Sequence, residues 1–503
     1  MSFDHAIGRM IELGALPRAL EKMAEIVEKA IDARNEAEKG YSGGLPELRG
    51  FAHAAVRSLA HEAESAMQNH SEDSRYALVL ARAWVLACWA ADGPEGCRLV
   101  LQKVDAISHK FPGREEFAIE QAKAWRHYCF ALGHSGLTRE CRNAAQQIDE
   151  IVKSFPKQPL LAAESAKAWG DVCYANAWYG KGDGCPEAVA NVESLADRFL
   201  DLSEFVLQKA EVRKELGRAF ASFGTTEDCN RAAQQVDEIA NACSEDMMLA
   251  WKGVSAWKWV CFANVLHGTE EGCRKALERV VNIASRYPER AQFRAEHADA
   301  LQCMCAVFGK FGKVKNCEET AQQVEEVARD FSGMIDFDHA CSEAWKHVSY
   351  THSRCGTVEG CQKALAKIKA IADLFPGEER FQLTLSSALR NLSYALTRFD
   401  RPQGIEGIAY QIEDIASHVS AQEKIAENRV LAWTYACWAN AKTGNIIGWR
   451  QAAGRARQIA EAFPTNQDVQ NGWQECLRLV KAFEENYRQI HSGQATNLSP
   501  EPL

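Results

Sequence analysis

The feature that most constrains this chain is an internal repeat of 44 residues. An aromatic residue, Phe155 in the unit 112–155, closes seven of the nine units and is in five of them followed by proline. A fixed period of this length is typical of stacked supersecondary units, each of which buries its apolar face only against its neighbours. The chain is therefore predicted to fold as one elongated array. The register is clearest in one cysteine position, occupied by Cys97, Cys141, Cys185, Cys229, Cys273, Cys317 and Cys361.

Each unit contains two stretches in which apolar residues recur at helical spacing. In the unit 112–155 the first helix is expected from Glu115 to about Ser135, and the second from about Thr138 to Phe155. Gly136 separates them, and glycine suits a left-handed turn at a helix C-terminus. Each unit is therefore predicted to be a helical hairpin. The same turn is expected at Gly180, Gly224, Gly268, Gly312, Gly356 and Gly444.

Nine such units span residues 68–463. Residues 1–67 do not follow the repeat pattern and are expected to form two long helices, 17–37 and 45–67, that cap the N-terminal end. The eighth unit keeps the period but has Pro402 near the usual glycine and Ile405 at the cysteine position, so it is a degenerate repeat. Residues 464–491 are predicted to form a C-terminal capping helix, because the last repeat needs a polar outer face. Residues 492–503 are polar and expected to be a disordered tail.

The composition restricts the function. The 503 residues are 47% hydrophobic and 25% charged, which is ordinary for a globular core. A net charge of −10 disfavours non-specific binding to nucleic acid or membranes by the molecule as a whole. The first residues lack an export pattern, and no run of apolar residues is long enough for a membrane span. Twelve of the 18 cysteines occupy two fixed repeat positions, as core residues do, so reduced thiols and a cytoplasmic location are expected.

The first helix carries Trp125-x-x-Tyr128-Cys129-x-x-Leu132, which resembles the Trp-x-x-Leu-Gly-x-x-Tyr signature of tetratricopeptide repeats. Small residues recur at the Cys129 position, and alanine recurs at Ala144, as in that family. Relative to the 34-residue family unit, this unit has three extra residues in the turn and seven before the tryptophan. The resemblance implies an all-α, right-handed α-solenoid of about nine helix-turn-helix repeats with helical caps.

The resemblance also implies that the first helices line a concave groove, with the residues one, five and nine positions after the tryptophan on the groove face. These positions form two partly basic rows and one mostly aromatic row, and spacing of four keeps them on one helix face. Basic residues are densest in the C-terminal half, where the main contact is expected. The candidate partner-binding residues are Arg126, Phe130, Lys214, Lys258, Phe262, Lys346, Tyr350, Arg354, Arg390, Tyr394, Arg398, Trp438 and Lys442.

Such a groove could hold an acidic, aromatic-containing or phosphorylated protein segment. The alternative functions are binding of single-stranded nucleic acid, since aromatic rings stack on bases and Lys and Arg contact phosphates, and self-association as a structural repeat protein. The same pattern also fits aromatic residues that pack between repeats while Lys and Arg stems cover them. No catalytic motif, cofactor site or metal site occurs in the pattern, so a non-enzymatic scaffold or adaptor is expected.

Overall fold

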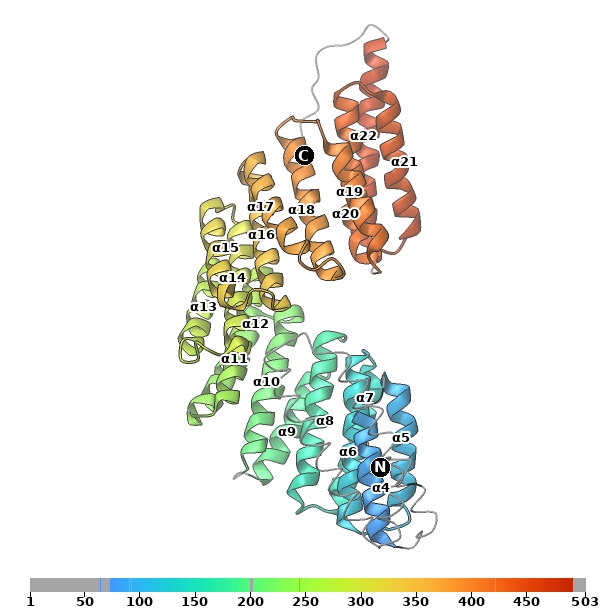
Figure 1. The fold of residues 1–503 in the computed structure, drawn as a ribbon, viewed down its shortest axis with the longest axis vertical. Coiled ribbons are helices and arrows are strands. Elements are labelled where there is room, and N and C mark those ends of the chain that lie inside the picture. The colour runs from blue at the N-terminus through green and yellow to red at the C-terminus, as the bar shows by residue number, and fades with distance from the viewer. Residues whose placement is uncertain are drawn as a thin grey trace, which may run out of the picture. The chain divides into compact units, whose positions relative to one another are not determined.

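The computed structural model describes residue 64 and residues 73–89, 91, 93–199, 202–243, 245–420 and 422–491. Within these ranges all regular structure is helical (Figure 1), which confirms the predicted all-α class. None of the described helices is both long enough and apolar enough to cross a bilayer. The predicted N-terminal cap, apart from residue 64, and the predicted tail lie outside the described residues.

The described helices form nine successive hairpins followed by one more helix. The first helices are α4 (Ser74–Trp89), α6 (Glu115–His134), α8 (Pro159–Trp178), α10 (Ser203–Phe223), α12 (Met247–Leu266), α14 (Ala291–Lys310), α16 (Ile335–Cys355), α18 (Glu379–Arg398) and α20 (Gln422–Lys442). The second helices are α5 (Gly93–Ser108), α7 (Thr138–Ser154), α9 (Cys185–Arg198), α11 (Thr226–Ala242), α13 (Glu270–Ala284), α15 (Val314–Ala328), α17 (Val358–Ala372), α19 (Ile405–His418) and α21 (Ile446–Ala462). The last helix is α22 (Gln467–His491).

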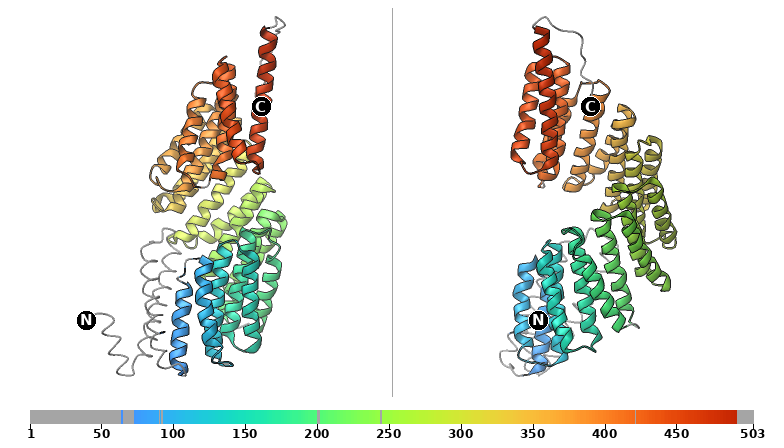
Figure 2. Two further views of the ribbon diagram at one scale, coloured as in Figure 1. Left: turned by 90° about the vertical axis from the view of Figure 1, so that its right-hand side faces the viewer. Right: turned by 180° about the vertical axis from the view of Figure 1, so that it is seen from behind.

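The chain divides into two compact units. Unit 1 comprises Met1–Gly268 and Lys275–Glu296, and unit 2 comprises Thr269–Arg274 and His297–Leu503. In unit 1 the first helices α4, α6, α8, α10 and α12 pack one against the next, and each second helix from α5 to α11 packs against its own first helix and the following one. In unit 2 the same order holds from α15 to α22 (Figures 1 and 2). Each unit therefore presents a continuous layer of first helices.

The two cysteine positions of the repeat meet inside the hairpin. The Sγ atoms of Cys129 on α6 and Cys141 on α7 lie 3.2 Å apart, and each thiol lies within hydrogen-bond distance of the other residue's carbonyl. Both side chains are fully buried, so they act as small core residues where the helices approach most closely. Thiol–carbonyl contacts of this kind recur in the pairs Cys173/Cys185 and Cys305/Cys317, and in the first hairpin Cys97 makes one with Cys88, which lies three residues after the repeat position.

The hairpin turns do not all have the predicted conformation. Gly136, Gly312 and Gly444 adopt the expected left-handed conformation, with φ of 76°, 68° and 74°. The prediction is wrong at Gly180, Gly224, Gly268 and Gly356, none of which has a positive φ. At Gly224 and Gly356, φ is −111° and −108°. Glycine is needed there for space, because a Cβ atom on Gly356 would lie 2.3 Å from the ring of His352, and one on Gly224 would lie 2.8 Å from the ring of Phe220.

A buried tryptophan joins adjacent hairpins. Trp169 is 2% exposed, and its indole N–H donates to Asp149 Oδ2 of the preceding second helix at 3.0 Å. The acceptor lies 20 residues before the tryptophan, on α7. The contact provides a specific polar link between neighbouring repeats and satisfies an indole N–H that would otherwise be costly to bury. The same contact occurs in the pairs Trp257/Asp237, Trp345/Glu325 and Trp433/Glu413.

Candidate functional site

The first basic row lies along the layer of first helices, one residue after the tryptophan position, and it is neutralised by carboxylates. Lys258 Nζ lies 2.6 Å from Glu296, Arg390 lies 2.9 Å from Glu427, and Lys346 pairs with Glu343. Several of these carboxylates belong to the next first helix, so the pairs also hold neighbouring repeats together. The six members with a carboxylate partner are Arg82, Arg126, Lys214, Lys258, Lys346 and Arg390.

Lys214 is the most deeply buried basic residue of this row, whose other basic members are half-buried. Its residue is only 9% exposed, and its ammonium lies 2.8 Å from Glu211 and 2.9 Å from Glu215. Burial opposes the charged form, but the two carboxylates outweigh it and raise the pKa of Lys214 above its usual range. Glu211 also pairs with Lys252 on α12. Lys214 therefore stays charged and paired at any ordinary pH.

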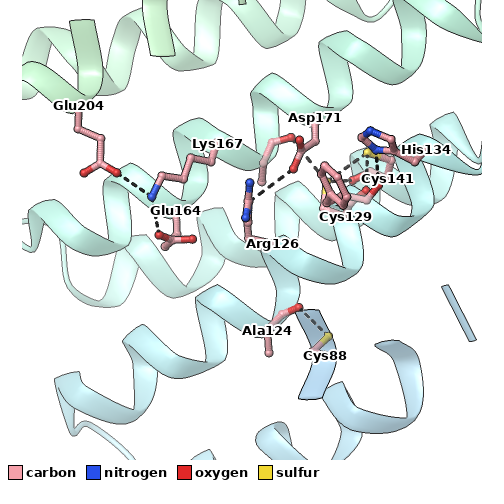
Figure 3. Close-up of polar contacts among 12 residues, drawn as sticks. Cys88, Ala124, Arg126, Cys129, His134, Cys141, Glu164, Lys167, Asp171 and Glu204 are labelled. Atoms are coloured by element: carbon pink, nitrogen blue, oxygen red, sulfur yellow. Dashed lines mark hydrogen bonds and ion pairs between the residues drawn. The ribbon is translucent and has the colours of Figure 1, made fainter. Parts of the chain in front are cut away.

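Arg126 and Asp171 form a looser pair between α6 and α8 (Figure 3). Arg126 Nε lies 3.7 Å from Asp171 Oδ2, and neither atom has a hydrogen-bond partner among the described residues. Burial raises the pKa of the Asp171 carboxyl to about 7, although Arg126 opposes this change. By contrast, Lys167 in the same view lies between two carboxylates, 2.9 Å from Glu164 and 2.7 Å from Glu204.

Asp171→Asn is expected to change the pH dependence of stability. The folded-state pKa of about 7 lies above the unfolded value of about 3.9, so between about pH 4 and pH 7 the folded chain binds more protons than the unfolded chain. The free energy of unfolding contributed by this group therefore falls as pH rises through that window. The asparagine variant should lose this fall and be more stable than wild type at about pH 8, by up to about 4 kcal/mol.

Urea unfolding followed by circular dichroism from about pH 4 to pH 8 would measure the effect. Glu227→Gln, at an exposed carboxylate on α11, serves as the control and should leave the pH dependence as in wild type. An asparagine variant whose stability still falls as steeply as that of wild type would contradict the assignment to Asp171.

The predicted aromatic row is divided between surface and core. Phe130 is exposed, whereas Phe262, Tyr350 and Tyr394 are half-buried. Trp438 is 4% exposed and packs in the core of unit 2, so its ring is covered. Phe130 continues into a chain of ring contacts across α6 and α8, formed by the pairs Phe130/His134, His134/Tyr174 and Tyr174/Trp178 at centroid distances of 3.9, 4.5 and 5.7 Å.

The third row differs from the first because two of its arginines lack a carboxylate partner. Arg354 on α16 and Arg398 on α18 are exposed, and no carboxylate of the described residues lies within 4.0 Å of either guanidinium. Arg354 donates to the Tyr350 hydroxyl at 2.6 Å, and Arg398 donates to the Ser353 carbonyl at 3.4 Å. Helices α16 and α18 pack side by side in unit 2. Together with Tyr394, these residues define the arginine patch: Tyr350, Arg354, Tyr394 and Arg398.

Lys442, on α20, is the remaining predicted member of the third row. Its ammonium lies 3.1 Å from Asp400 in the turn after α18, and the two side chains are 31% and 62% exposed. An exposed pair of this kind contributes little to stability. Lys442 can therefore exchange Asp400 for another anion at small cost.

The sequence pattern did not predict the carboxylates that neutralise the first row. Glu343 precedes Trp345 by two residues, and Glu296 precedes Leu301, at the tryptophan position, by five. Burial raises the pKa of Glu343, but Lys346 and Thr384 outweigh burial and lower it to about 2. For Glu343 the sequence held a signal, because it lies three residues before Lys346, and opposite charges at that spacing on a helix are neighbours. For Glu296 it held none, because that residue pairs with Lys258 on the preceding first helix.

Comparison with known proteins gives structural matches alone. No family model matches the chain, and no curated protein is similar to it. A monomeric mutant of IFIT1 with m7Gppp-AAAA matches at 12% identity and a TM-score of 0.28, covering 82% of this chain and 84% of that one. Yeast Tom70 matches at 11% identity and a TM-score of 0.29, covering 89% of this chain and 99% of that one. The P58(IPK) tetratricopeptide-repeat domain matches at 12% identity and a TM-score of 0.22, covering 91% of this chain and 98% of that one.

These structural neighbours are tetratricopeptide-repeat proteins, the family that the first-helix signature resembles. At these TM-scores the superpositions position no residue of this chain. The helical-repeat architecture rests instead on the order and packing of its own helices, which alternate as first and second members of hairpins through both units.

Proposed function

We propose that this chain is a non-enzymatic scaffold or adaptor that binds an acidic protein segment through the arginine patch of unit 2. The observation that carries this proposal is the contrast between two rows on the same helix layer. The basic residues of the first row form ion pairs with carboxylates of the chain itself. Arg354 and Arg398, by contrast, have exposed guanidinium groups without a carboxylate partner among the described residues. Planar guanidinium groups on two adjacent helices suit bidentate pairing with carboxylates or phosphates on a partner.

The tyrosines of the patch supply the apolar part of the contact. Tyr350 and Tyr394 are half-buried, each four residues before its arginine, so one face of each ring is positioned by packing. Rigid aromatic side chains next to arginine are typical of residues that dominate binding energy in protein interfaces. In this proposal Lys442 extends the patch along α20, and the other predicted groove residues remain predicted contacts.

Single-stranded nucleic acid is the second candidate. Binding of this kind needs a run of cations that follows the phosphate backbone, and the neutralised first row leaves few described cations for it. The net charge of −10 acts in the same direction. We therefore favour a protein partner, and we place its binding in the cytoplasm, where the buried thiols would stay reduced.

A direct comparison of the two ligand classes tests the proposal. The full chain is titrated with a fluorescein-labelled peptide rich in glutamate and tyrosine and, separately, with a labelled thymidine oligonucleotide, by fluorescence anisotropy at two salt concentrations. The peptide is expected to bind the more tightly. Tighter binding of the oligonucleotide, lost steeply with salt, would overturn the proposal in favour of nucleic acid.

A further inference from the structure

Arg218 on α10 occupies the position at which neighbouring first helices carry Tyr174 and Phe262. Its guanidinium lies between two tryptophans of adjacent helices, 2.6 Å from a ring centroid of Trp178 on α8 and 4.5 Å from one of Trp259 on α12. The residue is only 7% exposed. One ring from each neighbouring first helix therefore contacts this guanidinium.

The N–H donors of Arg218 are nevertheless unused. Among the described residues no group accepts a hydrogen bond from its guanidinium, and no carboxylate lies within 4.0 Å of it. Its unpaired nitrogen atoms are not fully buried, so they keep contact with solvent. An arginine has five N–H donors and cannot lose its charge at ordinary pH. Buried charges are normally paired, so this one points to an external anion.

The surrounding charges leave Arg218 available. Glu215, whose charge acts on Arg218, pairs with Lys214 at 2.9 Å, and Lys214 in turn also pairs with Glu211. Lys252 on the next first helix is likewise paired with Glu211. Among the described lysines and arginines of α10 and α12, Arg218 is therefore the one without a carboxylate within 4.0 Å.

We propose that Arg218 is the anion-binding element of a second partner site, in unit 1, and that it takes a carboxylate from an acidic and aromatic protein segment. The planar fork matches a carboxylate in bidentate geometry, and the flanking tryptophans hold the fork in place before binding. Trp178 is 47% exposed and continues through Tyr174 and His134 to the exposed Phe130, which provides a row of rings for an aromatic side chain of the partner.

The charge pattern favours this partner over single-stranded nucleic acid. A nucleic acid presents one phosphate per nucleotide and is held by several cations along its backbone. Arg126, Lys214 and Lys252 near this row are already paired with carboxylates, so the row offers one anion contact among several rings. One carboxylate next to an aromatic residue fits that arrangement.

The test uses the full chain carrying Arg354→Glu and Arg398→Glu, so that the arginine patch of unit 2 does not contribute. A fluorescein-labelled peptide of alternating glutamate and phenylalanine is titrated by anisotropy. Adding Arg218→Gln should weaken binding by at least about tenfold. The affinity of the Arg218→Lys variant should be intermediate, because lysine keeps the charge but cannot pair with a carboxylate through a planar guanidinium group. Arg231→Gln on α11 is the control and should leave the affinity unchanged.

Unchanged affinity of a folded Arg218→Gln variant, or no binding of the peptide to the parent chain, would overturn the proposal for unit 1 and leave the patch in unit 2 untouched. Binding of a labelled thymidine oligonucleotide through Arg218, in place of the peptide, would also overturn it. If Arg218→Gln fails to fold, the indole N–H signals of Trp178 and Trp259 decide the question by NMR. Peptide binding should shift both signals, and unshifted signals under saturating peptide would contradict the site.

Discussion

Replacing Arg354 and Arg398 by glutamate is expected to weaken binding of an acidic partner by about 3 kcal/mol, or roughly a hundredfold. The two arginines are exposed on adjacent first helices and have no carboxylate partner among the described residues. Reversal of both charges removes two charge-assisted contacts and places like charges opposite each other in the interface. Isothermal calorimetry with the glutamate- and tyrosine-rich peptide would measure the loss.

A control of equal charge change separates local recognition from general electrostatics. Lys315→Glu with Lys363→Glu alters two exposed lysines on the second helices α15 and α17 of the same unit. This control should bind the peptide almost as wild type does. Circular dichroism should show both double variants folded, since all four side chains project from helix surfaces. Equal losses in the two double variants would show that the arginine patch has no special role.

Trp169→Ala is expected to destabilise unit 1 by about 3–5 kcal/mol. The substitution leaves a cavity between α7 and α8, and it also leaves Asp149 without the indole donor that lies 3.0 Å away. Asp149 is half-buried, and its loss of a hydrogen bond adds to the cost of the cavity. Urea unfolding monitored by circular dichroism would give the change in the free energy of unfolding.

Trp178→Ala provides the matched control, because that tryptophan lies on the same helix with 47% of its surface exposed. Its loss should cost far less stability than the loss of Trp169. If the two alanine variants were equally stable, the tryptophan–carboxylate contact between repeats would not be the link that the structure indicates.

The helical hairpins were predictable from the sequence because their causes are local. Apolar spacing marks the two helices of each unit, and the helix from Glu115 ends at His134, one residue before the predicted end. The period of 44 residues repeats those local signals, which makes each boundary visible several times. Gly136 and Gly312 have the predicted positive φ because the turn itself requires it.

The paired state of the basic row was not predictable in the same way. Whether Lys258 is free to bind another protein or is paired with Glu296 depends on how α12 packs against the part of α14 that carries Glu296, 38 residues later in the chain. Trp438 belongs to an aromatic row by its spacing, yet tertiary packing covers its ring. Arg354 and Lys346 share a helix face and look alike in the sequence, and the structure separates them by the presence of a carboxylate partner.

Arginine labelling with phenylglyoxal tests the central claim most directly, namely that a partner binds the layer of first helices in unit 2. The wild-type chain is labelled alone and with saturating acidic partner, and the modified arginines are identified by mass spectrometry. Arg354 and Arg398 should be modified in the chain alone and protected in the complex, while the exposed Arg401 in the turn after α18 is modified equally in both. Equal modification of Arg354 and Arg398 in the two samples would contradict the claim.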